Sequence, residues 1–361
     1  MQMLYKPDWE QARARMLAWW AGAESDRPII QVTAPRREAP GRPGWSSWSL
    51  IHNLDHPERA LEGYEAYCRD TFFGGEAFPN LWINLGPGVT AAYLGRVPRI
   101  AEETVWFEAA EAMSWERILS LRLDPDDKWW AITKRLTSLA TERGHGQYFA
   151  SVTDLNGVHN VLGSLRGTQR LAMDCLDDPD LVKRASAHLT DIWLQCYDEL
   201  VGITQRRQEG SSSWMGIWFP GRGSDVQSDF AAMLSPRMFA DLILPDLRRQ
   251  CQHVEQSIFH WDGPGQIRHL DALLDIPELG GLQWVPGAGN PTTGSPQWFP
   301  LYQRIQARGK RLVLQGMEPG DVRGVVETCD PRGLLITTSC ATEQEARDLL
   351  AMVPQWARAR R

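Results

Sequence analysis

Four short apolar segments recur at nearly even spacing in the last third of the chain, and this regularity constrains the fold more than any other feature. Each segment is followed by a loop and then by a helical pattern. The segments are 257–260, 281–285, 311–315 and 334–338. Strands that alternate with helices in this way form consecutive βα units, whose strands lie in parallel. The sequence therefore predicts an α/β fold built on a parallel sheet.

The same alternation can be followed back toward the N-terminus. Helical spacing is expected over residues 9–23, 57–73 and 178–200, and strands over 27–33, 147–153 and 213–218. Ser235 and Pro236 have the composition of a helix start, with a capping serine followed by proline at the first helical position. Counting the units gives about eight, which favours a closed (β/α)8 TIM barrel over an open doubly wound sheet. No linker or low-complexity stretch interrupts the pattern, so residues 1–361 are expected to form one domain with an N-terminal helical segment over 1–25.

The amino-acid composition limits the kinds of binding partner and the cellular compartment that we expect for this protein. The net charge of −7, without a long basic run, argues against a nucleic-acid or anionic-membrane surface as the main partner. The six cysteines show no CxxC pairing and the N-terminus has no apolar signal, so we expect a cytoplasmic protein in a reducing environment. The 17 tryptophans indicate either an aromatic-lined cavity or core packing.

A candidate metal site lies where the segment 258–262 runs into the Gly/Pro turn 263–265. Side chains alternate along a strand, so His260 and Asp262 share one face while Trp261 points away. The last predicted strand delivers a lone cysteine, Cys340, at its own end. Zinc accepts imidazole, carboxylate and thiolate ligands in one tetrahedral shell and keeps a fourth position for substrate. The sequence thus predicts a zinc site at His260, Asp262 and Cys340, with His260 and Asp262 as catalytic residues.

Two alternatives remain open for this site. Without a metal, Asp262 would be a general base or a counter-charge to a cationic substrate, and His260 a hydrogen-bonded structural residue. Other polar and aromatic residues near predicted strand ends are candidates for substrate contact, with helix capping or core packing as their structural alternative. They are Asp154, Trp214, Trp218, Asp229, Trp261, Gln283, Trp284 and Gln315.

Residues 228–245, with the sequence SDFAAMLSPRMFADLILP, resemble a signature of the uroporphyrinogen decarboxylase-like superfamily. Further segments of similar kind follow in the expected order, at 165–179, 315–319 and 339–340. The resemblance implies a (β/α)8 barrel. Residues 32–38 lack the arginine-rich segment of the true decarboxylases, so tetrapyrrole decarboxylation is not expected.

The corrinoid-linked methyltransferase branch of the superfamily binds zinc through a His-x-Cys strand end and a late cysteine. This chain matches that pattern at His260 and Cys340 but has Asp262 in place of the middle cysteine. The resemblance implies a zinc-dependent methyltransferase of one-carbon metabolism that moves a methyl group between a small donor or thiol and a corrinoid protein. A carboxylate ligand would make the metal harder, which favours oxygen or nitrogen ligands over a soft thiol.

The cobalamin would have to come from a separate corrinoid protein, because no Asp-x-His-x-x-Gly motif occurs in this sequence. The resemblance also allows a homodimer. Two alternative functions stay open. One is a lyase or decarboxylase that acts on a small carboxylated substrate with Asp262 as acid/base. The other is a ligand-binding barrel without catalysis.

Overall fold

The computed structural model describes residues 3–36, 45–107 and 111–360. A seven-stranded sheet with the order β2-β1-β13-β12-β11-β10-β9 forms its centre. The strands of this sheet are β1 (Ile29–Pro35), β2 (Thr71–Gly75), β9 (Gly223–Gln227), β10 (Gln256–Asp262), β11 (Gly281–Val285), β12 (Arg311–Met317) and β13 (Leu334–Ser339). All neighbouring strands are parallel except β1 and β2, which are antiparallel. The predicted α/β fold with a mostly parallel sheet is confirmed.

Three two-stranded sheets accompany the large one. They pair β3 (Asn80–Leu81) with β6 (Phe149–Ala150), β4 (Arg99–Ile100) with β5 (Val105–Trp106), and β7 (Ser211–Ser212) with β8 (Trp218–Phe219). The strand expected over 213–218 is a hairpin turn instead, because Gly216 takes a left-handed backbone angle, φ 66°, that glycine adopts without strain. The helix expected over 57–73 ends at Asp70, where Thr71 and two phenylalanines favour a strand.

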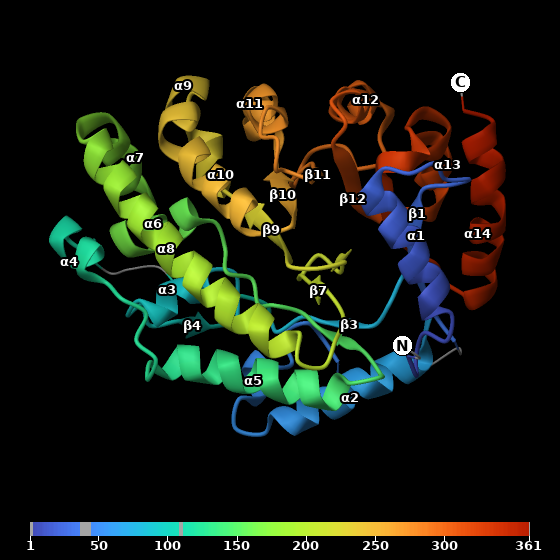
Figure 1. The fold of residues 1–361 in the computed structure, drawn as a ribbon, viewed down its shortest axis with the longest axis horizontal. Helices are drawn as coiled ribbons and strands as arrows, with labels where there is room; N and C mark the ends of the chain where they lie inside the picture. The colour runs from blue at the N-terminus through green and yellow to red at the C-terminus, as the bar shows by residue number, and fades with distance from the viewer. Residues whose placement is uncertain (1–2, 37–44, 108–110, 361) are drawn as a thin grey trace.

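The helices surround the strands in Figure 1, with α2 and α5 below them, α6 to α8 on the left and α13 and α14 on the right. Ser235 caps its helix as predicted, since its side chain accepts a hydrogen bond from Met238 N. The α-helices are α1 (Trp9–Ala21), α2 (Pro57–Asp70), α3 (Val89–Tyr93), α4 (Trp115–Ser120), α5 (Lys128–Gly144), α6 (Val158–Arg166), α7 (Thr168–Asp177), α8 (Pro179–Thr204), α9 (Pro236–Met238), α10 (Leu244–His253), α11 (Leu270–Leu274), α12 (Phe299–Ala307), α13 (Pro319–Thr328) and α14 (Glu343–Arg358).

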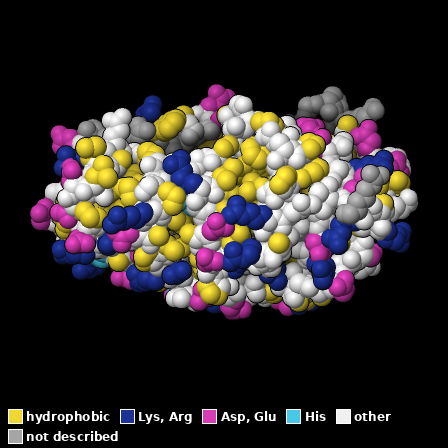
Figure 2. Space-filling view, turned by 90° about the horizontal axis from the view of Figure 1, so that it is seen from above, with side chains coloured by type: hydrophobic (Ala, Val, Ile, Leu, Met, Phe, Trp, Pro, Cys, Tyr) yellow, Lys and Arg dark blue, Asp and Glu magenta, His cyan; other side chains and the backbone are white. Residues whose placement is uncertain are grey.

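On the face seen in Figure 2, acidic, basic and apolar side chains are interspersed. Within the described ranges, no helix combines the length and the apolar character needed to cross a bilayer.

The sheet separates two hydrophobic cores. Along β10, Phe259 and Trp261 belong to an outer core between the strands and the helices, whereas Ile258 belongs to an inner core. The inner core joins apolar residues of several strands to α1, and its principal members are Trp9, Met16, Trp19, Trp20, Ile29, Phe149, Trp218, Phe219, Ile258, Val313 and Leu335. Since the strand members stand near the amino ends of their strands, α1 covers that end of the inner face.

Candidate functional site

The inner face changes from apolar to polar toward the carboxyl ends of the strands. Each of the strands β1, β10, β12 and β13 contributes one residue to the inner core, and the side chain two positions later points to the same face. These later side chains are polar: Gln31, His260, Gln315 and Thr337. The opposite end is filled by the aromatic residues of α1 and β8. On these four strands, the polar side chains of the inner face therefore lie toward the carboxyl ends.

Three side chains that are able to hold a metal ion converge at this end. Asp229, His260 and Asp262 each offer one ligand atom, and these atoms all lie within 4.8 Å of one another. His260 and Asp262 share one face of β10, and Asp229 follows β9, whose Gln227 pairs with His260 in parallel register. The parallel pairing of β9 and β10 thus brings Asp229 beside the two residues that alternation predicts. The set of one imidazole and two carboxylates suits a hard or borderline divalent cation such as zinc.

Two further carboxyl groups are buried beneath this cluster. Asp154 accepts a hydrogen bond from Gln227 Nε2 at 2.8 Å, and Asp225 accepts one from Trp214 Nε1 at 2.8 Å. Burial raises the pKa of both carboxyl groups, and the charge of Asp225 raises the pKa of Asp154 further. Loss of hydration disfavours the ionised form of each acid. A cation bound nearby would stabilise the ionised form of both carboxyl groups.

Asp229 is the most exposed of the three cluster residues. The protein around it raises the pKa of its carboxyl group, chiefly through lost hydration, while His260 lowers that pKa and Asp262 raises it. Asn160 Nδ2 donates to Asp229 Oδ2 at 2.9 Å and holds the carboxylate in place. A divalent cation between Asp229, His260 and Asp262 would remove the repulsion between the two acids.

A chain of hydrogen bonds fixes the orientation of the His260 ring. His260 Nδ1 lies 2.5 Å from Gln283 Oε1, Gln283 Nε2 lies 2.5 Å from Gln315 Oε1, and Gln315 Nε2 lies 2.5 Å from the carbonyl oxygen of Met215. The direction follows from the last partner, because a carbonyl oxygen can only accept. Gln315 must donate to Met215, Gln283 to Gln315, and His260 Nδ1–H to Gln283. With Nδ1 as the donor, Nε2 is the ring nitrogen left to bind a metal.

Replacing Gln283 with leucine is expected to weaken zinc binding by about 10- to 100-fold, the usual effect of losing the partner that orients a metal-binding histidine. The substitution removes the acceptor for His260 Nδ1–H without touching a ligand. Zinc affinity, measured by competition with a chromophoric chelator, checks this. Gln303→Leu, on the exposed face of α12, is the matched control and should bind zinc like the wild type. Equal affinities in the two variants would contradict the orienting role.

The structure does not bring Cys340 to this cluster. Alternation along β13 directs Leu335, Thr337 and Ser339 to the inner face, so Cys340, one residue further, turns into the outer core. Only 6% of it is exposed, and burial raises the pKa of its thiol. Among the residues that the structure describes, Asp229 is the third member of the cluster, in place of the cysteine that the sequence predicts.

The predicted site tryptophans separate into two groups. Trp214 lies near Asp225 as expected, and its ring meets that of His260 edge-on, with centroids 5.2 Å apart. Trp218 is buried in the inner core at the opposite end, where its Nε1 donates to the carbonyl of Glu209. Trp261 and Trp284 are buried in the outer core and pack on each other. The latter three fill the cores and do not line the cavity beside the cluster.

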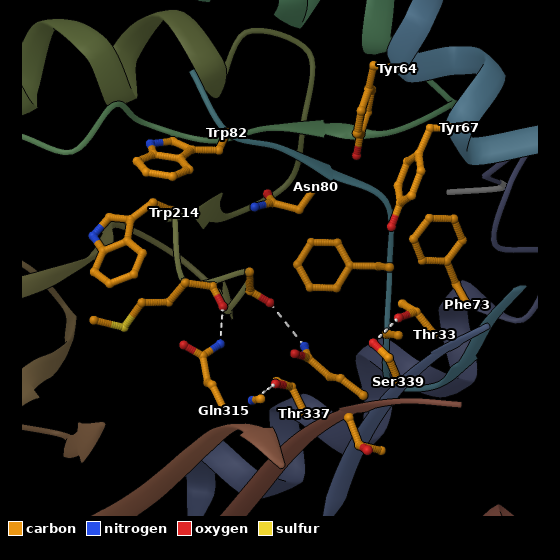
Figure 3. A pocket seen from close by; sticks show the side chains of 17 residues that line it. Thr33, Tyr64, Tyr67, Phe73, Asn80, Trp82, Trp214, Gln315, Thr337 and Ser339 are labelled. Carbon is orange, nitrogen blue, oxygen red and sulfur yellow. Dashed lines mark hydrogen bonds between the residues drawn. The ribbon is translucent and has the colours of Figure 1, made fainter. Parts of the chain in front are cut away.

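A cavity of about 300 Å³, shown in Figure 3, is lined in part by Trp214, whose ring contacts that of His260. Aromatic side chains surround it, and amide and hydroxyl groups lie between them. The lining residues are Gln31, Thr33, Tyr64, Tyr67, Phe73, Ala77, Phe78, Asn80, Trp82, Trp214, Met215, Gly216, Gln315, Gly316, Thr337, Thr338 and Ser339. Gln315 was expected from its strand end, whereas Tyr67, Phe73 and Trp82 come from α2, β2 and the segment after β3, which carry no βα signal.

Comparisons with known proteins identify the fold. Neither a family model nor a curated protein matches the sequence. The structure is similar to that of a methyltransferase from Methanosarcina mazei, with a TM-score of 0.58 and 13% sequence identity over 95% of this chain and 98% of the other. The chain therefore shares its overall fold, along nearly its whole length, with that archaeal methyltransferase.

Proposed function

We propose that the protein is a zinc-dependent methyltransferase that moves a methyl group between a small donor and the corrinoid of a separate partner protein. The observation that carries this proposal is the convergence of Asp229, His260 and Asp262 at the carboxyl end of the parallel sheet. Active sites of parallel α/β folds lie at that end. The fold shared with an archaeal methyltransferase supports the reaction class.

The proposed architecture is a TIM-type barrel in which the short strands β3, β6 and β7 join the six parallel strands of the large sheet into a ring. The inner core supports this, because it draws residues from β1, β6, β10, β12 and β13 around one centre. Main-chain hydrogen bonds link the short strands, from Ser151 N to Leu81 O at 2.9 Å and from Val152 N to Ser212 O at 3.1 Å. A ring of this kind places the cluster and the cavity at one mouth.

The residues of the cluster have distinct roles in this proposal. His260 offers Nε2 because Gln283 holds its Nδ1–H, and Asp229 and Asp262 offer carboxylate oxygens. Bound zinc would supply a positive charge that polarises the substrate atom attached to the methyl group. Asp225 holds Trp214 by its indole N–H, so the ring that lines the cavity and contacts His260 is fixed before substrate binds.

The test is the metal content of protein purified without chelator, determined by mass spectrometry. The wild type is expected to hold about one zinc ion per chain, as a three-ligand site with an open position does. Asp229→Ala and His260→Ala should lose the metal. Cys340→Ala should keep it, because its thiol lies in the outer core. Zinc that disappears with Cys340 and stays in Asp229→Ala would refute the proposed ligand set, and a metal-free wild type would refute the mechanism.

A further inference from the structure

The cavity of Figure 3 is linked to the proposed metal site through two of its lining residues, Trp214 and Gln315. Trp214 lines the cavity, and its ring lies 5.2 Å from the ring of His260. Gln315 also lines the cavity, and it reaches His260 through one intervening residue, Gln283. A molecule in this cavity would therefore contact residues that themselves contact His260 or its hydrogen-bond partner Gln283.

The lining carries no formal charge. Among the residues that the structure describes, the 17 that line the cavity include no Lys, Arg, Asp, Glu or His. Tyr64 stays neutral as well, because complete burial raises the pKa of its hydroxyl well above the usual value. A charged ligand would lose hydration here without gaining an ion pair. A carboxylate or sulfonate would also be repelled by the acids of the neighbouring cluster, Asp229 and Asp262.

The walls of the cavity suit a ring. Trp82 and Trp214 lie on one side and Tyr67 and Phe73 on the other, as Figure 3 shows. Flat apolar faces of this kind stack against aromatic rings and against the C–H faces of sugars. The hydrogen bond from Trp214 Nε1 to Asp225 fixes one of these faces.

Polar groups between the walls suit oxygen substituents on that ring. Thr33 and Ser339 hydroxyls pair at 3.0 Å at the edge of the cavity, and either can turn toward a ligand. Asn80 Oδ1 is a buried acceptor without a protein partner among the described residues, while its amide nitrogen donates to Ser213 O. An acceptor in this state gains a hydrogen bond from a hydroxyl donor.

We propose that the cavity binds an uncharged ring compound bearing a methoxy group, and that this methyl ether is the donor of the transfer. The inference rests on the proposed function. Two carboxylates and an imidazole make a bound zinc harder than a thiolate set does, and a hard cation favours an ether oxygen over a thiol. Methoxyarenes and O-methylated sugars share the required chemistry: an uncharged ring, oxygen substituents and an O-methyl group.

The methyl transfer requires one co-reactant, a corrinoid in its reduced Co(I) state, and with it the atoms and electrons of the reaction balance. The bond between oxygen and the methyl carbon breaks, and its electron pair stays on oxygen, which takes up a proton and leaves as the hydroxyl compound. The Co(I) centre supplies the electron pair of the new cobalt–carbon bond and is thereby oxidised to Co(III).

The binding test uses zinc-free protein, so that it does not depend on turnover. Tryptophan fluorescence and calorimetry follow titration with 2-methoxyphenol, methyl α-glucopyranoside and the charged analogue 2-methoxybenzoate. One of the neutral probes is expected to saturate, and the benzoate to bind about tenfold more weakly or not at all. The better neutral probe distinguishes an aromatic from a sugar donor. Absence of binding by both neutral probes, or tighter binding of the benzoate, would overturn the inference.

Variants locate the bound probe. Trp82→Ala should lower the affinity about tenfold by removing one wall. Ser339→Ala, a milder change, should lower it about fivefold by removing one hydrogen bond. The matched control is Trp106→Ala, because Trp106 is a half-exposed residue of β5 that does not line the cavity. This variant should bind the probe with the affinity of the wild type. A loss confined to Trp106→Ala would overturn the assignment to this cavity.

A transfer assay separates the two proposals. Zinc-loaded protein, the better probe and chemically reduced cobalamin should give methylcobalamin and the demethylated product, followed by absorbance and mass spectrometry. Probe binding with zinc bound but no transfer would refute the proposed function. Methyl transfer from a thioether such as dimethyl sulfide, without affinity for either neutral probe, would refute the methoxy inference alone.

Discussion

Replacing Trp218 with alanine is expected to lower the free energy of unfolding by about 3–5 kcal/mol, the range for removing a large aromatic side chain from a packed core. Trp218 is fully buried in the inner core and meets the ring of Trp9 edge-on, with centroids 5.8 Å apart. Trp218 Nε1 donates a hydrogen bond to the carbonyl oxygen of Glu209, and Trp20 Nε1 donates one to the carbonyl oxygen of Trp218. The substitution opens a void between α1 and the strands, which these neighbours cannot fill without moving α1.

Urea unfolding followed by circular dichroism measures this change. Trp106→Ala is the control, because Trp106 is 44% exposed, and its free energy of unfolding should stay within about 0.5 kcal/mol of the wild type. A similarly small effect in Trp218→Ala would mean that the residue does not hold the inner core together, and that a ligand-binding role for it must be reconsidered.

Replacing Glu76 with leucine is expected to destabilise the protein by about 3–5 kcal/mol, because it breaks a buried ion pair and leaves a buried cation behind. Glu76 is 1% exposed, and its two oxygens accept from both terminal nitrogens of Arg27 at 2.7 and 2.8 Å. The same carboxylate accepts from Ile30 N at 2.9 Å. It therefore holds the start of β1, the strand that brings Gln31 and Thr33 to the cavity.

The double variant Arg27→Leu with Glu76→Leu distinguishes two effects: the loss of the ion pair and the cost of leaving Arg27 without its partner. Removing both partners also removes the unpaired guanidinium, so the double variant is expected to be more stable than Glu76→Leu alone. Both are compared by urea midpoint under one set of conditions. A double variant at least as unstable as the single one would show that the main-chain contacts of Glu76 outweigh the ion pair.

The candidate site was predictable in part because of strand periodicity. His260 and Asp262 share a face of β10 by alternation, and the structure places both in the cluster. The same rule explains the misplaced cysteine. The strand β13 ends at Ser339 on the inner face, and one further residue takes Cys340 to the other side. A metal ligand predicted from its position in a motif is placed wrongly when the residue lies one position too far along the strand, because its side chain then points to the opposite face.

The third member of the cluster depended on contacts between distant segments. Asp229 stands 31 positions before His260, in a short 3-10 helix after β9, and nothing in its own segment marks it as a metal ligand. The lateral register of β9 against β10 brings it within reach. The aromatic walls likewise come from α2, β2 and the segment after β3, which meet only once the chain has folded.

By itself, the sequence determined the α/β class, the order of the parallel strands in the C-terminal part and the shared face of His260 and Asp262. These features follow from local periodicity, because side-chain direction along a strand repeats every two residues. Only the tertiary structure decided that Asp229 joins the cluster and that aromatic residues of α2, β2 and the segment after β3 form a cavity with Trp214. Those outcomes depend on strand register and on packing between segments far apart in the chain, which local pattern does not encode.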